Sequence, residues 1–215
     1  MTASGIILAA GRGERFGGPK VLAELGGVPV LLHSVRAFLS SQVVQELIVV
    51  AQPTMEPQVV ALLEALDFPV RVVPGGKRRR DSALAGVEEA KSEYVLIHDA
   101  ARPLVPPELI RRVLLAAEEH GAAVPVIPVV DTLRYVENGF LSGKSVSRAS
   151  LFAMQTPQAF RRDLLLSALR EADEELPDDA EALLRRGIPV AAVPGDPENL
   201  KITYPEDLLL LARLL

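Results

Sequence analysis

The chain has 215 residues, of which 49% are hydrophobic, and this is enough to build the core of one large domain. Its formal net charge of −5 argues against a nucleic-acid-binding surface, which would need a basic face. It contains no cysteine, which excludes a disulfide framework, a thiolate nucleophile and a zinc–thiolate site. We find no signal-peptide pattern and no apolar run of the roughly 18 residues that a membrane span needs, so we expect a cytoplasmic protein with no membrane partner.

Apolar runs of strand length alternate with helical patterns as far as residue 129. We predict strands at residues 6–8, 47–51, 70–73, 94–98 and 122–129, and helices at 29–39, 59–66, 81–90 and 107–119. The strands are apolar throughout rather than alternating, which is typical of strands that helices cover on both faces. This pattern predicts an α/β fold of the Rossmann-like kind, with a doubly wound, mainly parallel sheet.

A β-hairpin interrupts this pattern at residues 131–150. Two short alternating segments, 133–136 and 145–148, are joined by the turn Glu137-Asn138-Gly139, and Asn-Gly between such segments is a strong hairpin signal. A hairpin inserted into an α/β domain has little of its own to pack against, so we expect it to lie over the active site or to reach a second subunit. The α/β pattern then resumes within one domain of residues 1–215, with helices at 162–171 and 179–186, a strand at 190–193 and a helix from Pro205.

The first strand runs directly into a glycine-rich turn that carries two cations. Gly11 and Gly13 allow the backbone to approach a ligand, and successive N–H groups in such a turn form an anion-binding concavity. Arg15 and Lys20 can neutralise phosphate charge. The residue after Lys20 is valine, which offers no hydroxyl for Mg²⁺ and excludes a P-loop, and Phe16 stands where a dinucleotide fingerprint needs glycine or alanine. We therefore predict a nucleoside-triphosphate site.

Polar clusters also follow the third and fourth strands, at the sheet edge where α/β proteins bind ligands. After the third strand we expect Gly76 and Ser82 in the site, because they offer a backbone N–H and a small hydroxyl. Most of the basic run at 77–80 is expected to be a solvated turn. After the fourth strand, Asp99 can hold a substrate hydroxyl or a metal and Arg102 can orient it.

The remaining candidates are single residues. The histidines have no metal-ligand spacing, and we expect His98 to be packed at its strand end rather than to act as an acid or base. Thr132 opens the hairpin, Arg148 is the guanidinium on its return limb and Thr156 closes it. Lys201 follows the last strand, and its presence is suggestive because lysines are scarce in this chain.

Together these residues resemble the 2-C-methyl-D-erythritol 4-phosphate cytidylyltransferases of the non-mevalonate isoprenoid pathway, over essentially the whole chain. The first motif alone would indicate only a nucleotidyltransferase, and the H-D-A-A-R-P and T-P-Q elements make the resemblance specific. Six segments carry it: Leu8-Ala9-Ala10-Gly11 through Lys20, Gly75-Gly76 with Asp81-Ser82, His98 through Pro103, Asp131-Thr132, Gln155 through Gln158, and Asn199 through Thr203.

The sequence departs from the family pattern at two places. Lys77 stands where the family often has an acidic residue, and we leave it out of the site. Pro177 precedes Asp178-Asp179-Ala180 in a segment that looks like the family's T-D-E-A, without its threonine. The roles of Asp178 and Asp179 stay open at this point.

The resemblance implies a fold of the nucleotide-diphospho-sugar transferase type and a homodimer whose hairpin arms cross over. It implies attack by the substrate's phosphate on the α-phosphorus of CTP and release of pyrophosphate, with Mg²⁺ or another divalent cation held mainly by the phosphates rather than by the protein. Its catalytic cations would be Arg15, Lys20 and Lys201. It would bind CTP through Ala9, Ala10, Gly11, Gly13, Gly76 and Ser82, and methylerythritol phosphate through Asp99, Arg102 and Thr156, with Thr132 and Arg148 serving the partner's site.

Three other functions stay open on the sequence alone. A ribitol 5-phosphate cytidylyltransferase would run the same chemistry on another phosphorylated polyol. A guanylyltransferase of molybdenum-cofactor maturation shares only the first motif, and the hairpin and T-P-Q segment speak against it. A catalytically silent CTP-binding dimeric module is disfavoured by Arg15, Lys20 and Lys201, because pure sensing does not require transition-state cations.

Overall fold

The strand β1 (Ala3–Ala9) lies at the centre of the sheet, where it pairs in parallel with β4 (Val44–Ala51) on one side and with β6 (Tyr94–Asp99) on the other. The computed structural model describes residues 2–173 and 175–215. The strand order is β10-β7-β11-β6-β1-β4-β5, and β12 also pairs with β7. The remaining strands of this sheet are β5 (Val70–Pro74), β7 (Ala122–Pro128), β10 (Phe152–Met154), β11 (Gln158–Arg161) and β12 (Ala191–Pro194).

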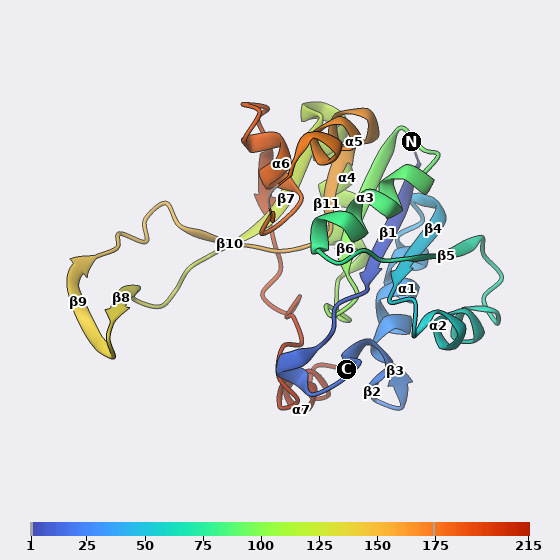
Figure 1. Cartoon of the computed structure of the whole chain (residues 1–215), viewed down its shortest axis with the longest axis horizontal. Coiled ribbons are helices and arrows are strands. Elements are labelled where there is room, and N and C mark those ends of the chain that lie inside the picture. The colour runs from blue at the N-terminus through green and yellow to red at the C-terminus, as the bar shows by residue number, and fades with distance from the viewer. Residues whose placement is uncertain (1, 174) are drawn as a thin grey trace.

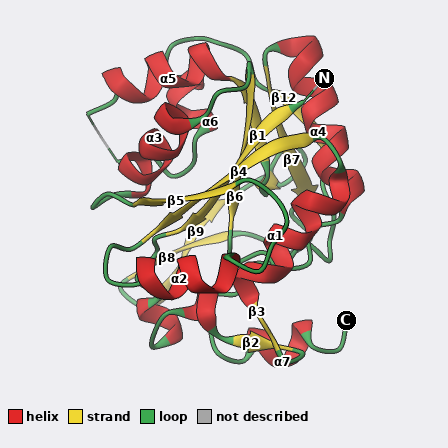
Figure 2. Cartoon of the chain, turned by 90° about the vertical axis from the view of Figure 1, so that its right-hand side faces the viewer, coloured by secondary structure: helices red, strands yellow, loops and turns green. Residues whose placement is uncertain are grey.

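Helices cover both faces of the sheet (Figure 2). One face packs against α1 (Val30–Ser41), α2 (Glu56–Leu63) and α4 (Pro107–His120), and the other against α3 (Arg79–Glu89), α5 (Arg162–Glu171) and α6 (Ala180–Leu184). Alternate residues of each strand therefore enter different cores, and in β1 Ile7 packs on the first side and Ile6 on the second. This explains why the strands are apolar at every position.

A smaller apolar cluster closes the end of the molecule that holds the C-terminus. It contains Leu25, Ile202 and Leu211, which come from β2 (Glu24–Leu25), from the segment after β12 and from α7 (Asp207–Leu211). β2 pairs with β3 (Val28–Pro29), and the 3₁₀ turns η1 (Glu14–Phe16) and η2 (Lys20–Leu22) lead into this hairpin. Within residues 2–173 and 175–215, none of the helices has the length and apolar character needed to cross a membrane.

The inserted hairpin reaches away from the rest of its own chain (Figure 1). It consists of β8 (Arg134–Glu137) and β9 (Phe140–Ser145), which pair only with each other in the described structure. Of the two expected placements, lying over its own active site is therefore wrong. We call residues 131–150 the arm.

The structure confirms the doubly wound, mainly parallel sheet and the predicted helices and strands of its body, with ends that differ by a few residues. The helix expected at 179–186 is shorter, spanning Ala180–Leu184, and the last helix begins at Asp207 rather than at Pro205. The short strands β2, β3, β10 and β11 were not predicted. β11 is antiparallel and lies between β6 and β7, so the sheet is mixed at this point.

One strand of the arm was placed wrongly by the sequence analysis. The return strand is Phe140–Ser145 instead of 145–148. Asn138 and Gly139 have φ values of 52° and 83° and form a two-residue turn, so Glu137 pairs directly with Phe140. A two-residue turn of this kind starts the return strand at the next residue, so the strand begins at Phe140.

Candidate active site

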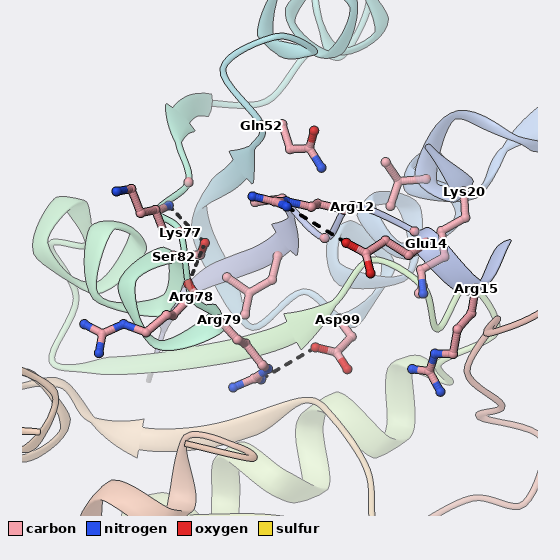
Figure 3. Close-up of a pocket in the computed structure, with 18 of the residues that line it drawn as sticks. Arg12, Glu14, Arg15, Lys20, Gln52, Lys77, Arg78, Arg79, Ser82 and Asp99 are labelled. Carbon is pink, nitrogen blue, oxygen red and sulfur yellow. Dashed lines mark hydrogen bonds and ion pairs between the residues drawn. The ribbon is translucent and has the colours of Figure 1, made fainter. Parts of the chain in front are cut away.

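A cavity of about 1090 Å³ lies beyond the carboxyl ends of the central strands. The loops after β1, β4, β5 and β6 contribute to its lining, because these parallel strands all end at the same edge of the sheet. Figure 3 shows the charged side chains that surround it. Five of the residues predicted to bind CTP line it: Ala10, Gly11, Gly13, Gly76 and Ser82. Ala9 does not, since its side chain is fully buried in the core beneath.

The glycine-rich turn after β1 folds on itself and leaves a row of free amides. The carbonyl of Gly13, a residue with φ of 66°, accepts hydrogen bonds from the amides of Phe16 and Gly17 at 2.9 and 3.0 Å. Any Cβ on Gly13 would collide with the carbonyl oxygen of Gly18. Within the described part of the chain, the backbone N–H groups of residues 11–15 have no acceptor. Amides without an acceptor in such a turn are available to an anion, and this is the arrangement that the sequence predicts.

The wall opposite this turn is built by the loop after β5. The hydroxyl of Ser82 accepts a hydrogen bond from the N–H of Gly76 at 3.1 Å, which fixes the loop against the start of α3. Gly75 approaches Ala10 so closely that a Cβ on it would overlap the Cβ of Ala10. The two loops thus touch at the floor of the cavity. Gly75 is required there because a side chain would not fit, and not because of its backbone angles.

The three cations predicted to be catalytic, Arg15, Lys20 and Lys201, all line the cavity. The ammonium of Lys20 donates to the carbonyl of Ile202 at 2.9 Å, so the C-terminal segment holds it in place. Burial lowers the pKa of Lys20 below its usual value and the neighbouring Lys201 lowers it further, while Asp99 acts in the opposite direction. Arg15 is exposed, with its guanidinium 6.0 Å from the centre of the Tyr204 ring.

Asp99 is the carboxylate at the centre of this charge arrangement. One of its oxygens accepts from the Lys201 ammonium at 2.6 Å, and the other lies 3.5 Å from the guanidinium of Arg79. Burial by itself would raise the pKa of Asp99, but Lys201 and Arg79 together outweigh it and hold that pKa well below its usual range. Asp99 is therefore ionised at neutral pH and stays paired.

The basic run at 77–80 is not the solvated turn that the sequence predicted. Arg78 and Arg80 both form ion pairs with Asp81, at 2.9 and 2.8 Å, and Arg79 pairs with Asp179 at 2.8 Å. The prediction failed because these side chains lie at the start of α3, where acidic residues from α3 and from the start of α6 surround them. Lys77 does line the cavity, as does Arg79.

The side chains of Arg102 and Thr156, two of the predicted substrate ligands, do not line the cavity in this chain. The guanidinium of Arg102 donates to the carbonyl of Asn199 at 2.7 Å. The hydroxyl of Thr156 is buried, where it accepts from the N–H of Asp99 at 3.1 Å and bonds the Nδ1 of His98 at 3.0 Å. Both residues lie directly behind Asp99 and support its backbone.

His98 is packed as the sequence predicts. Its ring is fully buried, and its second nitrogen bonds the carbonyl of Arg102 at 3.1 Å. Burial lowers the pKa of His98 to about 4, so the ring is neutral at physiological pH. The ring does not line the cavity, so it is not placed to exchange a proton with a ligand there.

Thr132 and Arg148 are exposed residues of the arm, and neither lines the cavity of its own chain. Sequence reasoning also missed several lining residues, among them Gln52, Thr54, Arg79 and Thr203. Gln52 and Thr54 follow the predicted strand at 47–51. Their position just beyond a strand end could have indicated that they line the site.

A doubly wound sheet whose first strand ends in a cationic glycine-rich turn over a large cavity defines the protein as a nucleotidyltransferase. The chain belongs to the 2-C-methyl-D-erythritol 4-phosphate cytidylyltransferase family, whose model matches residues 4–215. It is thus an enzyme, a cytidylyltransferase, and the family assignment does not favour the alternative functions.

Individual relatives agree with this assignment over most of their length. The 2-C-methyl-D-erythritol 4-phosphate cytidylyltransferase of Cereibacter sphaeroides is 43% identical, with 100% of this chain and 97% of that protein covered. That of Frankia casuarinae is 43% identical, over 98% of this chain and 80% of its own length. The crystal structure of the Thermus thermophilus enzyme of the same name matches with a TM-score of 0.85 at 37% identity, covering 100% of this chain and 98% of that one.

The electrostatics of the cavity can be tested on Lys20 without substrate. We expect the ammonium of Lys20 to titrate below the usual lysine pKa, and Asp99→Asn to lower that pKa further because it removes the carboxylate that opposes deprotonation. A ¹³Cε NMR titration of labelled lysine measures this directly. The matched control is Asp163→Asn. It removes a carboxylate of α5 that pairs with Arg161, and it should leave the Lys20 titration unchanged. A rise in the Lys20 pKa in Asp99→Asn would contradict the geometry.

Proposed function

We propose that the enzyme transfers a cytidylyl group from CTP to 2-C-methyl-D-erythritol 4-phosphate, giving 4-diphosphocytidyl-2-C-methyl-D-erythritol and pyrophosphate in isoprenoid precursor biosynthesis. The observation that carries this is the convergence of Arg15, Lys20 and Lys201 with the free amides of the glycine turn at one cavity, in a chain of this family. We place the reaction in the cytoplasm, since CTP is a soluble nucleotide.

The reaction needs positioning and charge neutralisation more than proton transfer. A phosphate oxygen of the acceptor forms a bond to the α-phosphorus of CTP, and the bond from that phosphorus to the bridging oxygen breaks, so that pyrophosphate leaves with the electron pair. A phosphate monoester is already mostly ionised at neutral pH, so its oxygen attacks without a general base. This agrees with a cavity lined by cations, next to which His98 is buried and neutral.

Arg15 and Lys20 are assigned to the charge that builds up around the α-phosphate. Neither forms an ion pair with a carboxylate of the described chain within 4 Å, so both are available to a triphosphate. The carbonyl of Ile202 and the half-buried position of Lys20 hold its ammonium in advance, and a fixed charge does not need to reorganise during the reaction. Ala10, Gly76 and Ser82 are assigned to the cytosine and ribose.

The donor set fits a divalent cation that the nucleotide brings with it. Among the described residues, no group of three or more histidine, cysteine or acidic side chains could hold a metal ion. The carboxylates that line the cavity are Glu14 and Asp99, and Asp99 is occupied by Lys201. Mg²⁺ commonly binds through substrate phosphates and water with few protein ligands. We propose that it is bound in this way, where it would neutralise charge on the triphosphate.

We further propose a homodimer in which each arm reaches the partner's cavity. The arm exposes large apolar side chains, with Phe140 79% and Leu141 72% accessible, and monomeric soluble proteins rarely leave such groups together on the surface. Thr132 and Arg148 belong to the arm and do not line the cavity of their own chain, so they would act in the partner's site, with Arg148 on the acceptor phosphate.

Pyrophosphate release distinguishes the possible functions. We expect release from CTP and Mg²⁺ with methylerythritol 4-phosphate and not with ribitol 5-phosphate, and we expect EDTA to stop it. Release with ribitol 5-phosphate only would move the enzyme to another phosphorylated polyol. CTP binding with no release from either acceptor would instead identify a nucleotide-binding module.

Removing the Lys20 ammonium tests its role in the transition state. We expect Lys20→Ala to lower kcat by at least about a hundredfold with little change in the KM for CTP, because the contact strengthens only as charge develops. Steady-state kinetics with both substrates measure this. Lys91→Ala, on an exposed residue before β6 at the amino end of the strands, is the matched control and should keep wild-type rates. A loss confined to CTP binding would exclude the catalytic role.

Mixed dimers test the crossed arms. We expect Arg148→Ala mainly to raise the KM for the phosphorylated acceptor. Co-expressed Arg148→Ala and Lys20→Ala subunits would form dimers in which one composite site has both residues intact. At acceptor concentrations well below the KM of the Arg148→Ala variant, random pairing restores about a quarter of wild-type activity, since half of the dimers are mixed and one of the two sites in each is complete. Purified mixed dimers would show about half. Absence of rescue in purified mixed dimers would rule out the arrangement.

A further inference from the structure

Four charged side chains from four separate segments form a continuous line of ion pairs that ends at the cavity. Asp179 precedes α6, Arg79 is the first residue of α3, Asp99 ends β6 and Lys201 follows β12. Arg79 Nη2 lies 2.8 Å from Asp179 Oδ2 and 3.5 Å from Asp99 Oδ1, and Lys201 Nζ lies 2.6 Å from Asp99 Oδ2. Figure 3 shows the guanidinium of Arg79 beside Asp99. We call these four residues the ion-pair chain.

Asp179 has no contact with the cavity and is linked to it through the other members of the ion-pair chain. Its side chain is 1% exposed and it does not line the cavity. The exposure of Arg79 is 25%, that of Asp99 is 13% and that of Lys201 is 40%, and these three residues all line the cavity. The ion-pair chain thus runs from the buried start of α6 to a solvent-accessible ammonium.

Helix capping does not explain why an aspartate occupies position 179. Asp179 is the N-cap of α6, but its side chain makes no capping hydrogen bond. Asp178 accepts from the N–H of Glu181 at 3.1 Å, and the side-chain oxygen of Gln158 accepts from the N–H groups of Asp179 and Ala180 at 3.2 Å each. The helix start is therefore satisfied by other groups, and the carboxylate of Asp179 turns to Arg79 instead.

The contact between Asp179 and Arg79 is not an ideal structural ion pair either. Asp179 Oδ1 and Arg79 Nη1 are buried and have no hydrogen-bond partner among the described residues. Buried polar atoms are normally paired, and the exceptions in a native protein call for an explanation. The guanidinium of Arg79 lies closer to the carboxylate of Asp179 than to that of Asp99. The nearest cation to Asp99 is therefore Lys201.

We propose that Asp179 and Arg79 are positioning residues that set the place of Lys201 in the cavity. The charge of Asp179 holds the guanidinium of Arg79 at a distance from Asp99. Without that charge, the guanidinium would pair with both oxygens of Asp99, because a guanidinium matches a carboxylate best in the bidentate geometry. Lys201 would then lose its partner and its fixed position. This inference rests on the proposed function only where it assigns Lys201 to the transfer step.

The test compares Asp179→Asn with Asp179→Glu. Asparagine keeps the size of the side chain and removes its charge, whereas glutamate keeps the charge and changes the size. We expect Asp179→Asn to lower kcat/KM for the phosphorylated acceptor by about tenfold, to leave the KM for CTP within about twofold, and to be the worse of the two variants. A packing role for Asp179 predicts the reverse order and would overturn the proposal.

Two controls separate positioning from general damage. Arg80→Lys alters the next residue of α3, which is equally ion-paired but does not line the cavity, and it should keep wild-type kinetics. In an Asp99→Asn background, Asp179→Asn should have no further effect, because the link through Asp99 is already broken. Additive losses would show that Asp179 acts by another route and would overturn the proposal. Rates are referred to folded protein measured by circular dichroism.

A readout that needs no turnover keeps this inference distinct from the proposed function. Amine acylation followed by mass spectrometry reports how firmly the Lys201 ammonium is held. We expect Lys201 to be labelled severalfold faster in Asp179→Asn than in the wild type and in Arg80→Lys, with Lys144 on the arm as the internal reference. Unchanged labelling would overturn the positioning role. If the wild type releases no pyrophosphate, the proposed function fails and the labelling result still decides the role of Asp179.

Discussion

The pairing of Asp99 with Lys201 is the contact on which the site depends, because it joins the centre of the sheet to the C-terminal segment. Asp99 ends β6 beside β1, and Thr156 and His98 fix it from behind. Lys201 lies 102 residues further along the chain and meets that carboxylate at 2.6 Å. The same segment supplies the carbonyl of Ile202 that holds Lys20, so one strand end determines where two of the three cations lie.

The cavity presents cations although the protein as a whole is acidic, and this would suit an anionic nucleotide. The chain carries a net charge of −5, yet the acidic groups near the cavity are used to hold cations in place. Asp99 pairs with Lys201 and Asp179 pairs with Arg79, whereas Arg15 and Lys20 form no ion pair with a carboxylate of the described chain. A buried carboxylate that orients a cation is costly to leave unpaired, so each member of such a network constrains the next.

The arm differs from the rest of the domain in how its side chains are buried. Residues of the sheet are buried between two helical layers, whereas β8 and β9 pair only with each other among the described residues and expose Phe140 and Leu141. The body alone builds the part of the site that carries the glycine turn and the cations. The arm extends away from this part of the molecule.

The amino-acid sequence alone was enough to predict the parallel strands, the main helices and the glycine turn with its cations, since apolar runs mark buried strands and polar residues at their ends must meet at one edge. It also marked Lys201 and Asp99 as separate candidates. Only the tertiary structure joined them, and only it showed that the arginines at 78–80 are paired and that Asp179 points to Arg79. Ion pairs between residues about a hundred positions apart leave no local pattern, because they depend on which loops the sheet order brings together.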